Sequence, residues 1–296
     1  MTPKVMSMAE AVRRCVPDGA SVALGLALEP AIPFALVHEL VRARRHDLRL
    51  IGPISDMAFD ILISAGCVAE IDAAWVGNVS AGLAHGYRRA MEKGIPRRIV
   101  VRDHSNLSIG LSLLAGALGS PYIPTRSLLG TDLARANGTF REAPSPFDGT
   151  PTLLLPAIEP DVAVLAVQRS DEDGNAQLWG PWGISQEAAL ASKAVIVVAD
   201  ELVDRSVIRA DPNRTVAPAF KVAAVVVQRG ACHPSPLQDR YGRDHSFFHA
   251  YHDATRSAEG YAAWAKEWIL DLPDHEAYLA KLGPRWEALV AQERAR

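Results

Sequence analysis

Short apolar runs rich in β-branched residues recur along this sequence, and longer amphipathic or Ala-rich segments separate them. Each run has the length of a strand, and the clearest of them, such as 21–26 and 194–199, are apolar on both faces, as is typical of strands inside a parallel sheet. We predict strands at 21–26, 48–51, 71–76, 99–101, 162–167, 194–199 and 221–227. A strand, a helix and a parallel strand in succession form a right-handed crossover unit. The sequence therefore predicts an α/β fold with an open, mostly parallel sheet flanked by helices.

The segments between these runs predict the helices. The first helix opens at a capping box formed by Ser7 and Glu10 and extends to about residue 16. Further helices are predicted at 33–44, 56–65, 83–93, 107–118 and 185–191, and the chain is amphipathic and helical from 245 onward. The Arg-Ala-Arg-Arg stretch at 42–45 is interpreted as a solvated helix end. We expect residues 1–255 to form one α/β domain, with 256–296 as a C-terminal helical extension packed on it.

Two regions depart from this alternation. Residues 121–149 are rich in Pro and Gly and show little periodicity, so we interpret them as a long excursion that covers the domain. A strand is predicted next, at 152–155. The turn sequence at 171–175 predicts a hairpin that returns the chain to a strand at 176–179.

Composition and charge argue against several classes of protein. The 296 residues are 49% hydrophobic with a formal net charge of -3, which allows a large core and favours neither nucleic acid nor an anionic membrane as partner. No apolar run has the length of a membrane span, and the first residues lack an apolar signal core. Three widely spaced cysteines predict reduced thiols in a cytoplasmic protein, and no zinc-type cysteine pair or other metal motif is present.

Small or polar residues follow most of the predicted strands. These strand ends are 25–29, 53–55, 77–80, 103–106, 200–201 and 230–235. The carboxyl ends of parallel strands meet along one edge of a sheet, where open α/β sheets bind their ligands. The sequence contains no GxGxxG turn, no Walker lysine loop and no GxSxG elbow, so the chemistry of this edge is not a dinucleotide, phosphate-loop or serine-hydrolase site.

The turn at 103–106 carries the clearest candidate for proton transfer. His104 has an ordinary pKa suited to that role, and we expect Asp103 to orient it. Ser105 or Asn106 is expected to cap the helix that follows. The alternative is an ordinary turn of capping residues without chemistry.

Two further candidates at strand ends have equally plain alternatives. Glu29 is a candidate substrate-binding carboxylate, against the alternative of a helix cap or a surface ion pair. Cys232 beside His233 suggests a thiolate pair, but neighbours in sequence need not face one another.

Seven short segments, in order along nearly the whole chain, resemble the A (alpha) subunit of family I CoA-transferases, closest to the glutaconate CoA-transferase type. The most specific are the LGSPYIPTR segment at 118–126, which is similar to the family's LGxPFxPxR, and the hairpin at 171–179. The turn at 230–235 resembles the family's GAHPS turn with Cys232 inserted. The remaining segments are 4–7, 22–25, 241–244 and 266–268.

The resemblance implies that coenzyme A enters as a substrate thioester, that a carboxylic acid is the acceptor, and that no metal takes part. In the family the group that attacks the thioester is a glutamate of the B (beta) subunit, and covalent relay splits the transfer into easier steps. This chain would then supply one wall of a site shared with the B subunit, in a heterotetramer or larger assembly that is active only with that subunit. Five polar residues would orient the acceptor or flank the reacting carbonyl: Asn78, Ser80, Asp103, His104 and Ser105.

Relatives of this family are not all transferases. One branch hydrolyses a carbon–carbon bond in a CoA-linked ring remnant, and another decarboxylates a glutaconyl-type CoA. The ring-opening branch has an acidic residue where this chain has His104, which argues against hydrolysis but leaves open a reaction in which His104 moves a proton. A third hypothesis, a non-catalytic sugar-phosphate effector domain, lacks the basic recognition helix that usually accompanies it.

Overall fold

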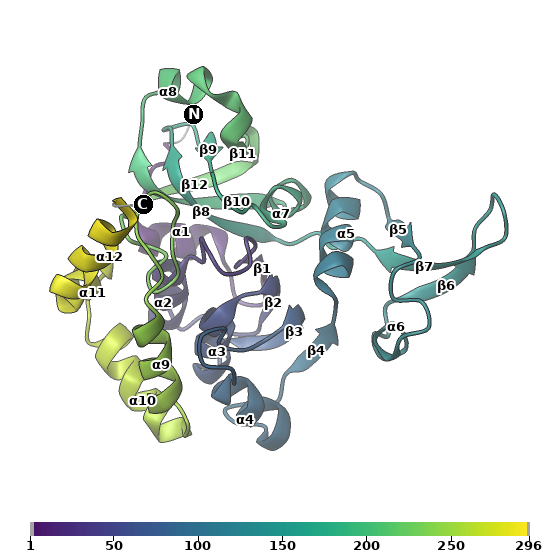
Figure 1. Cartoon of the computed structure of the whole chain (residues 1–296), viewed down its shortest axis with the longest axis horizontal. Coiled ribbons are helices and arrows are strands. Elements are labelled where there is room, and N and C mark those ends of the chain that lie inside the picture. The colour runs from purple at the N-terminus through teal and green to yellow at the C-terminus, as the bar shows by residue number, and fades with distance from the viewer. Residues whose placement is uncertain (1–2, 295–296) are drawn as a thin grey trace.

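A parallel sheet forms the central layer of the chain, which the computed structural model describes from residue 3 to residue 294. Its strands lie side by side in the order β4-β3-β2-β1-β8-β10-β12 (Figure 1). Their bounds are β1 Ser21–Ala23, β2 Leu48–Ile54, β3 Val68–Trp75, β4 Val100–Asp103, β8 Val162–Ser170, β10 Ala194–Leu202 and β12 Val222–Val227. The short strands β9 (Ala176–Gln177) and β11 (Thr215–Ala217) add antiparallel pairs beyond the end of β8. The predicted fold class is confirmed.

Helices cover both faces of this sheet. The helix α5 (Asn106–Ala117) packs on β2 and β3 and against α7 (Ser185–Ala191). The helices α1 (Met8–Cys15), α2 (Phe34–Arg42), α3 (Asp56–Ser64) and α4 (His85–Lys93) pack in a row, each against the next. A short helix, α8 (Arg205–Ala210), precedes β11. The order of strands along the chain reverses between β1 and β8, which makes their carboxyl ends the topological switch point of the sheet.

The C-terminal helices lie beside α2 and α3 (Figure 1). They are α9 (His245–Ala254), α10 (Ala258–Ala265), a π-helical turn (Lys266–Leu270), α11 (His275–Leu282) and α12 (Pro284–Arg294). Aromatic side chains anchor them, since Trp264, Tyr278 and Trp286 are each less than a tenth exposed. Their burial makes these aromatic residues packing anchors for the C-terminal helices. Within residues 3–294, no helix is both long and apolar enough to cross a lipid bilayer.

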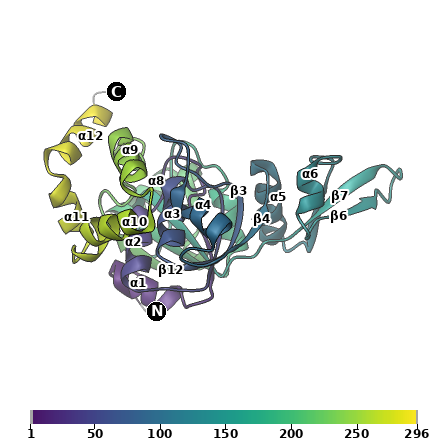
Figure 2. The same cartoon turned by 90° about the horizontal axis from the view of Figure 1, so that it is seen from below.

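The interpretation of residues 121–149 as a covering excursion is wrong. The segment belongs to an arm (residues 121–156) that projects away from the body beyond α5 (Figures 1 and 2). The arm is a three-stranded antiparallel sheet, with its helix α6 (Asp132–Ala136) between the first and second strands. The strands are β5 (Tyr122–Thr125), β6 (Arg141–Pro144) and β7 (Pro151–Pro156). The arm stands apart because it has a core of its own, formed by Phe140, Leu153 and Leu155.

Candidate functional site

Arg243 joins the carboxyl ends of β1, β2 and β3. Its Nη2 donates a hydrogen bond to Asp56, which follows β2, and its Nε donates to Ser80 Oγ at 3.1 Å, in the turn after β3. Its Nη1 lies 3.9 Å from Glu29 Oε2, in the loop after β1. The guanidinium also lies over the ring of Phe248, 3.9 Å from its centroid. One buried cation therefore fixes three strand ends relative to each other.

Asp56 is the buried partner of that cation. Its side chain is 0% exposed, and its Oδ1 accepts backbone hydrogen bonds from Met57 and Val79, both at 3.0 Å. The residue has φ 48°, a left-handed conformation that Asp tolerates better than most residues. Burial raises the pKa of the Asp56 carboxyl, and the Arg243 guanidinium opposes that shift. Asp56 thus ties the end of β2 to the turn after β3.

Asn78 shapes the turn that presents Ser80. Its Oδ1 accepts from the backbone N–H groups of Ser80 and Ala81, each at 3.1 Å, and its Nδ2 donates to the Phe248 carbonyl at 2.9 Å. Asn78 is 1% exposed, so its amide is occupied within the chain. Ser80 is half-buried, and its Oγ also lies 3.1 Å from Nδ1 of the exposed His245. The accessible groups around Arg243 are therefore Ser80, His245 and Glu29, and Glu29 has a side chain that is 51% exposed.

His104 belongs to a separate hydrogen-bonded group at β4. Its Nε2 lies 3.5 Å from Asp72 Oδ1, and its Nδ1 lies 3.3 Å from Ser108 Oγ. Its ring packs edge-on against Phe140 of the arm, and the residue is 3% exposed. The carboxylate beside His104 is therefore that of Asp72, not Asp103, and the expectation that Asp103 orients it is wrong. Asp103 is the last residue of β4, is exposed, and offers its carbonyl to Asn137 Nδ2 at 2.8 Å.

Asp72 carries the negative charge of this second group. Arg49 Nε lies 2.7 Å from its carboxylate and Arg102 Nη1 lies 3.6 Å away. Burial favours the neutral carboxyl, but the hydrogen bonds with His104 and Arg49 outweigh it and lower the pKa of Asp72. His104 therefore lies beside a carboxylate that stays ionised at neutral pH.

Ser105 caps α5, as expected from the sequence. Its Oγ accepts from the Ser108 N–H at 3.0 Å, and Ser108 Oγ accepts from the Ser105 N–H at 2.9 Å. This reciprocal pair is a capping box, and it satisfies two backbone donors at the start of the helix. The Ser105 hydroxyl is thus used by the helix, and it lies in the His104 group rather than the Arg243 group.

The Cys232–His233 thiolate pair is not formed. Burial raises the pKa of the Cys232 thiol to about 12, so the nucleophilic thiolate is scarce at neutral pH. Both ring nitrogens of His233 are bonded elsewhere, to Asp244 Oδ2 at 3.0 Å and to Tyr278 Oη at 2.7 Å. In the described part of the chain no three His, Cys, Asp or Glu side chains are placed to hold a metal ion.

Sequence reasoning missed Arg243 and Asp56 as members of this edge. Arg243 lies in one of the segments that carries the family resemblance, but nothing in that segment indicates which strands it joins. Asp56 begins a predicted helix, where an acidic residue needs no special explanation. The two are 187 residues apart in the chain, so no local pattern relates them.

The fold and this edge together define an α/β protein whose polar residues gather where parallel strands end, beside the switch point of the sheet, where such folds bind their ligands. The model of the coenzyme A transferase family matches residues 5–228. The chain belongs to the coenzyme A transferase family. A named relative is the A (alpha) subunit of the 3-oxoadipate CoA-transferase of Pseudomonas knackmussii, which is 36% identical over 279 residues, or 94% of this chain and 98% of that protein.

Solved structures agree with this assignment. The A (alpha) subunit of the glutaconate CoA-transferase of Acidaminococcus fermentans is 29% identical over an alignment of 297 positions, gaps included, which covers 95% of this chain and 92% of that protein. The crystal structure of that enzyme superposes with a TM-score of 0.89, covering 96% of this chain and 94% of its own. The crystal structure of a variant of the decarboxylase AibA/AibB is also similar, with 29% identity, a TM-score of 0.77 and coverage of 89% of this chain and 99% of its own.

Proposed function

We propose that this chain is the A (alpha) subunit of a heteromeric CoA-transferase that moves CoA between an acyl-CoA and a dicarboxylic acid. The observation that carries the proposal is the near full-length similarity to the corresponding subunit of the 3-oxoadipate enzyme, at 36% identity. The glutaconate enzyme is similar over an equally large share of the chain. The acids in both names are dicarboxylates, which favours an acceptor with two carboxylate groups.

In the proposed reaction a glutamate of the B subunit supplies the attacking carboxylate. It attacks the thioester carbonyl, the thiolate of CoA leaves, and an acyl-glutamyl anhydride forms. The thiolate then attacks the glutamyl carbonyl, which releases the original acid and leaves a glutamyl-CoA thioester for the acceptor acid to attack. The carboxylate of Asp56 is fully buried and paired with Arg243, so it is poorly placed to attack a thioester itself.

Within this chain, the accessible strand-end groups bind the acceptor acid. The Ser80 hydroxyl accepts from Arg243 Nε, and its own proton can go either to His245 Nδ1, 3.1 Å away, or to a carboxylate oxygen of the acid. Asn78 acts through the turn that it holds, and Glu29 borders the acid on the β1 side. Asp103, His104 and Ser105, at the end of β4, form the side of the site next to that strand. In CoA transfer His104 is a positioning residue, and in a reaction that moves a proton it carries that proton.

The assembly follows from the shared site. We propose a complex with a B subunit, in the form of a heterotetramer or larger, located in a reducing cytoplasm. Cys15, Cys67 and Cys232 are free thiols, which fits that compartment.

The test is an exchange assay with the reconstituted pair. The chain is co-purified with its B subunit, and CoA transfer from an acyl-CoA to a panel of dicarboxylic acids is followed. Either protein tested alone is the control and should be inactive. Borohydride should trap the glutamyl-CoA thioester on the B subunit. Absence of exchange with every acid, in a pair that assembles, would contradict the proposal.

Hydrolysis or decarboxylation of a CoA thioester is the second candidate. The similarity to the decarboxylase AibA/AibB favours it, because that structure covers most of this chain at 29% identity. The sequence of the B subunit discriminates the two candidates. A B subunit without the attacking glutamate would favour the second reaction, with His104 moving the proton.

A further inference from the structure

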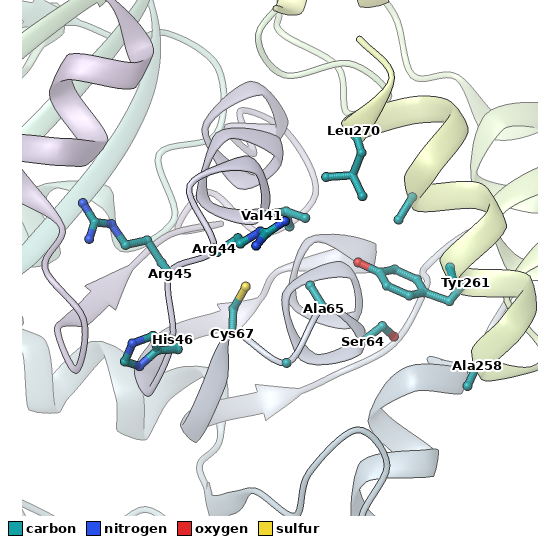
Figure 3. A pocket seen from close by; sticks show the side chains of 13 residues that line it. Val41, Arg44, Arg45, His46, Ser64, Ala65, Cys67, Ala258, Tyr261 and Leu270 are labelled. Carbon is teal, nitrogen blue, oxygen red and sulfur yellow. The ribbon is translucent and has the colours of Figure 1, made fainter. Parts of the chain in front are cut away.

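A cavity of about 510 Å³ lies at the opposite end of the sheet from the strand-end edge. It is formed by the end of α2 and the segment that follows it, and by the end of α3 and the loop that leads to β3, with α10 on the other side (Figure 3). We propose that this cavity binds an organic monocarboxylate with a short apolar chain, through an ion pair with Arg44.

The wall of the cavity is mostly apolar because its helices present small residues. Ala258, Ala262 and Ala265 lie along one face of α10, and Ala65 faces them from the end of α3. Three alanines spaced four and three residues apart leave a void where larger side chains would close the helices together. This gives room for an alkyl chain.

Two basic groups in the wall remain available to a ligand: the Arg44 guanidinium and Arg45 Nε, which has no hydrogen-bond partner. Tyr261 donates its hydroxyl to the Ile61 carbonyl at 2.9 Å, and the other terminal carbonyls of α3 accept from Gly66 and Cys67. Burial raises the pKa of the Cys67 thiol to about 12, so this group is neutral. The hydroxyl, the carbonyls and the thiol add no charge of their own to the cavity.

Arg44 is exposed and, within residues 3–294, its guanidinium has no hydrogen-bond or ion-pair partner. It has φ 52°, just past the end of α2, where glycine is the usual residue. A long cationic side chain in this left-handed position is uncommon, and here it lies beside Val41 in the wall of the cavity (Figure 3). The sequence alone indicates only a solvated helix end here.

Two more features fit a ligand of one negative charge. Arg45 and His46 already contact Asp18, at 3.8 and 3.2 Å, so little positive charge beyond that of Arg44 is left for a ligand. A π-helical turn, Lys266–Leu270, follows α10 at the rim and contributes Leu270 to the cavity. Such turns are rare and are frequently found at functional sites.

The test is calorimetric titration of the full-length chain at neutral pH with hexanoate as the probe. Acetate, which lacks the apolar chain, and hexanol, which lacks the charge, are the comparison ligands. We expect saturable hexanoate binding with a Kd below about 10 mM, and at least about tenfold weaker binding of both comparison ligands.

Variants assign the binding to this cavity. Arg44→Gln removes the charge but keeps a polar N–H donor, and it should weaken hexanoate binding about tenfold or more. Ala262→Leu fills the void from an exposed position and should do the same. Arg209→Gln, at another exposed arginine on α8, should have no effect.

Ser80→Ala tests whether hexanoate binds instead at the strand-end edge, where we propose that the acceptor acid binds. This variant should leave hexanoate binding unchanged. Loss of binding in Ser80→Ala but not in Arg44→Gln would overturn the inference. So would the absence of saturable binding in the unaltered chain.

Discussion

The role of His104 can be resolved with one substitution. His104→Ala removes the ring that packs on Phe140 and the partner of Asp72, so we expect a loss of about 2–4 kcal/mol in unfolding free energy, measured by urea denaturation. If the reaction is CoA transfer, the KM for the acid should rise while kcat changes by less than about threefold. His249→Ala, at an exposed histidine, is the matched control. Abolished turnover in a folded variant would instead favour hydrolysis or decarboxylation.

Arg243 and Asp56 should be strongly coupled, because each neutralises a charge that the other would leave buried. We expect Arg243→Met to cost about 3–5 kcal/mol in unfolding free energy, since Asp56 is then uncompensated. Adding Asp56→Asn, which keeps an acceptor for the backbone N–H groups, should recover part of that loss. Urea unfolding of the four proteins gives the coupling energy, and strictly additive effects would show that the pair is not an energetic unit.

Local patterns predicted the residues whose partners are close in sequence. The Ser105 cap and the bond from the Glu10 N–H to Ser7 Oγ depend on contacts three residues apart, which the sequence displays directly. The other half of the predicted Ser7–Glu10 capping box is not formed, because the Glu10 carboxylate pairs with Arg13. The partners of His104 and Arg243 come from other strands and helices. Asp72 lies on the neighbouring strand β3, and no periodicity along either strand indicates which residues face each other across a parallel pair.

Among the elements, the buried strands were predictable for a physical reason. A strand covered on both faces must be apolar throughout, so β8, β10 and β12 stand out as continuous runs. The arm was not predictable from the sequence, because its strands are short, half-exposed and interrupted by proline. The predicted strand at 152–155 is confirmed, but it pairs with β5 and β6 in a separate sheet. The sequence of the strand does not indicate which other strands it pairs with.

The arm should unfold separately from the body. Leu153 is 1% exposed in the small core of the arm, so Leu153→Ala should cost about 2–4 kcal/mol there. We expect faster proteolytic cleavage within residues 126–150, while the main thermal transition moves by less than about 2 °C. Phe147→Ala, at a side chain that is 96% exposed in the same arm, is the control and should change neither measurement. A large shift of the main transition in Leu153→Ala would show that arm and body unfold together.

The helix α11 should make the fold sensitive to acid. Burial lowers the pKa of His275 to about 3, and the nearby His233 and Arg42 act in the same direction against the hydrogen bond to the Gly230 carbonyl. Below about pH 6.5 the unfolded chain binds a proton at this position that the folded chain rejects. The contribution of His275 to the stability of the fold is therefore lost progressively as pH falls from about 6.5 toward 3. His38 and His233 are also buried with lowered pKa values and add to the same trend.

His275→Met isolates the contribution of this residue. The variant should be less stable at pH 7.5 by about 1 kcal/mol, because the hydrogen bond to Gly230 is lost. It should also lose less stability than the unaltered chain between pH 7.5 and 4.5, by urea unfolding at each pH. An equal loss in both proteins over that interval would assign the acid sensitivity to other groups.

At the scale of the whole molecule, the C-terminal helices hold the strand-end site together. Arg243 directly precedes Asp244, which caps α9 and binds both His233 and Arg285. Burial opposes ionisation of Asp244, but the hydrogen bonds from His233 and Arg285 hold its pKa well below the usual range. The position of Arg243 at β1, β2 and β3 thus depends on contacts made by α12, far along the chain.

Deleting residues 256–296 should therefore disrupt the body as well as remove the extension. The deletion uncovers His38 and Phe247, whose buried rings pack on Trp264 and Tyr278, and it removes Arg285 from Asp244. Each large aromatic side chain lost from the interface removes roughly 1.5–3 kcal/mol of hydrophobic stabilisation. The sum over these side chains is comparable to the unfolding free energy of a whole domain. We expect the 1–255 chain to be aggregated by size-exclusion chromatography and to lack the near-ultraviolet circular dichroism of the full chain. A soluble, monodisperse 1–255 chain with native near-ultraviolet signal would instead make 256–296 a separate domain.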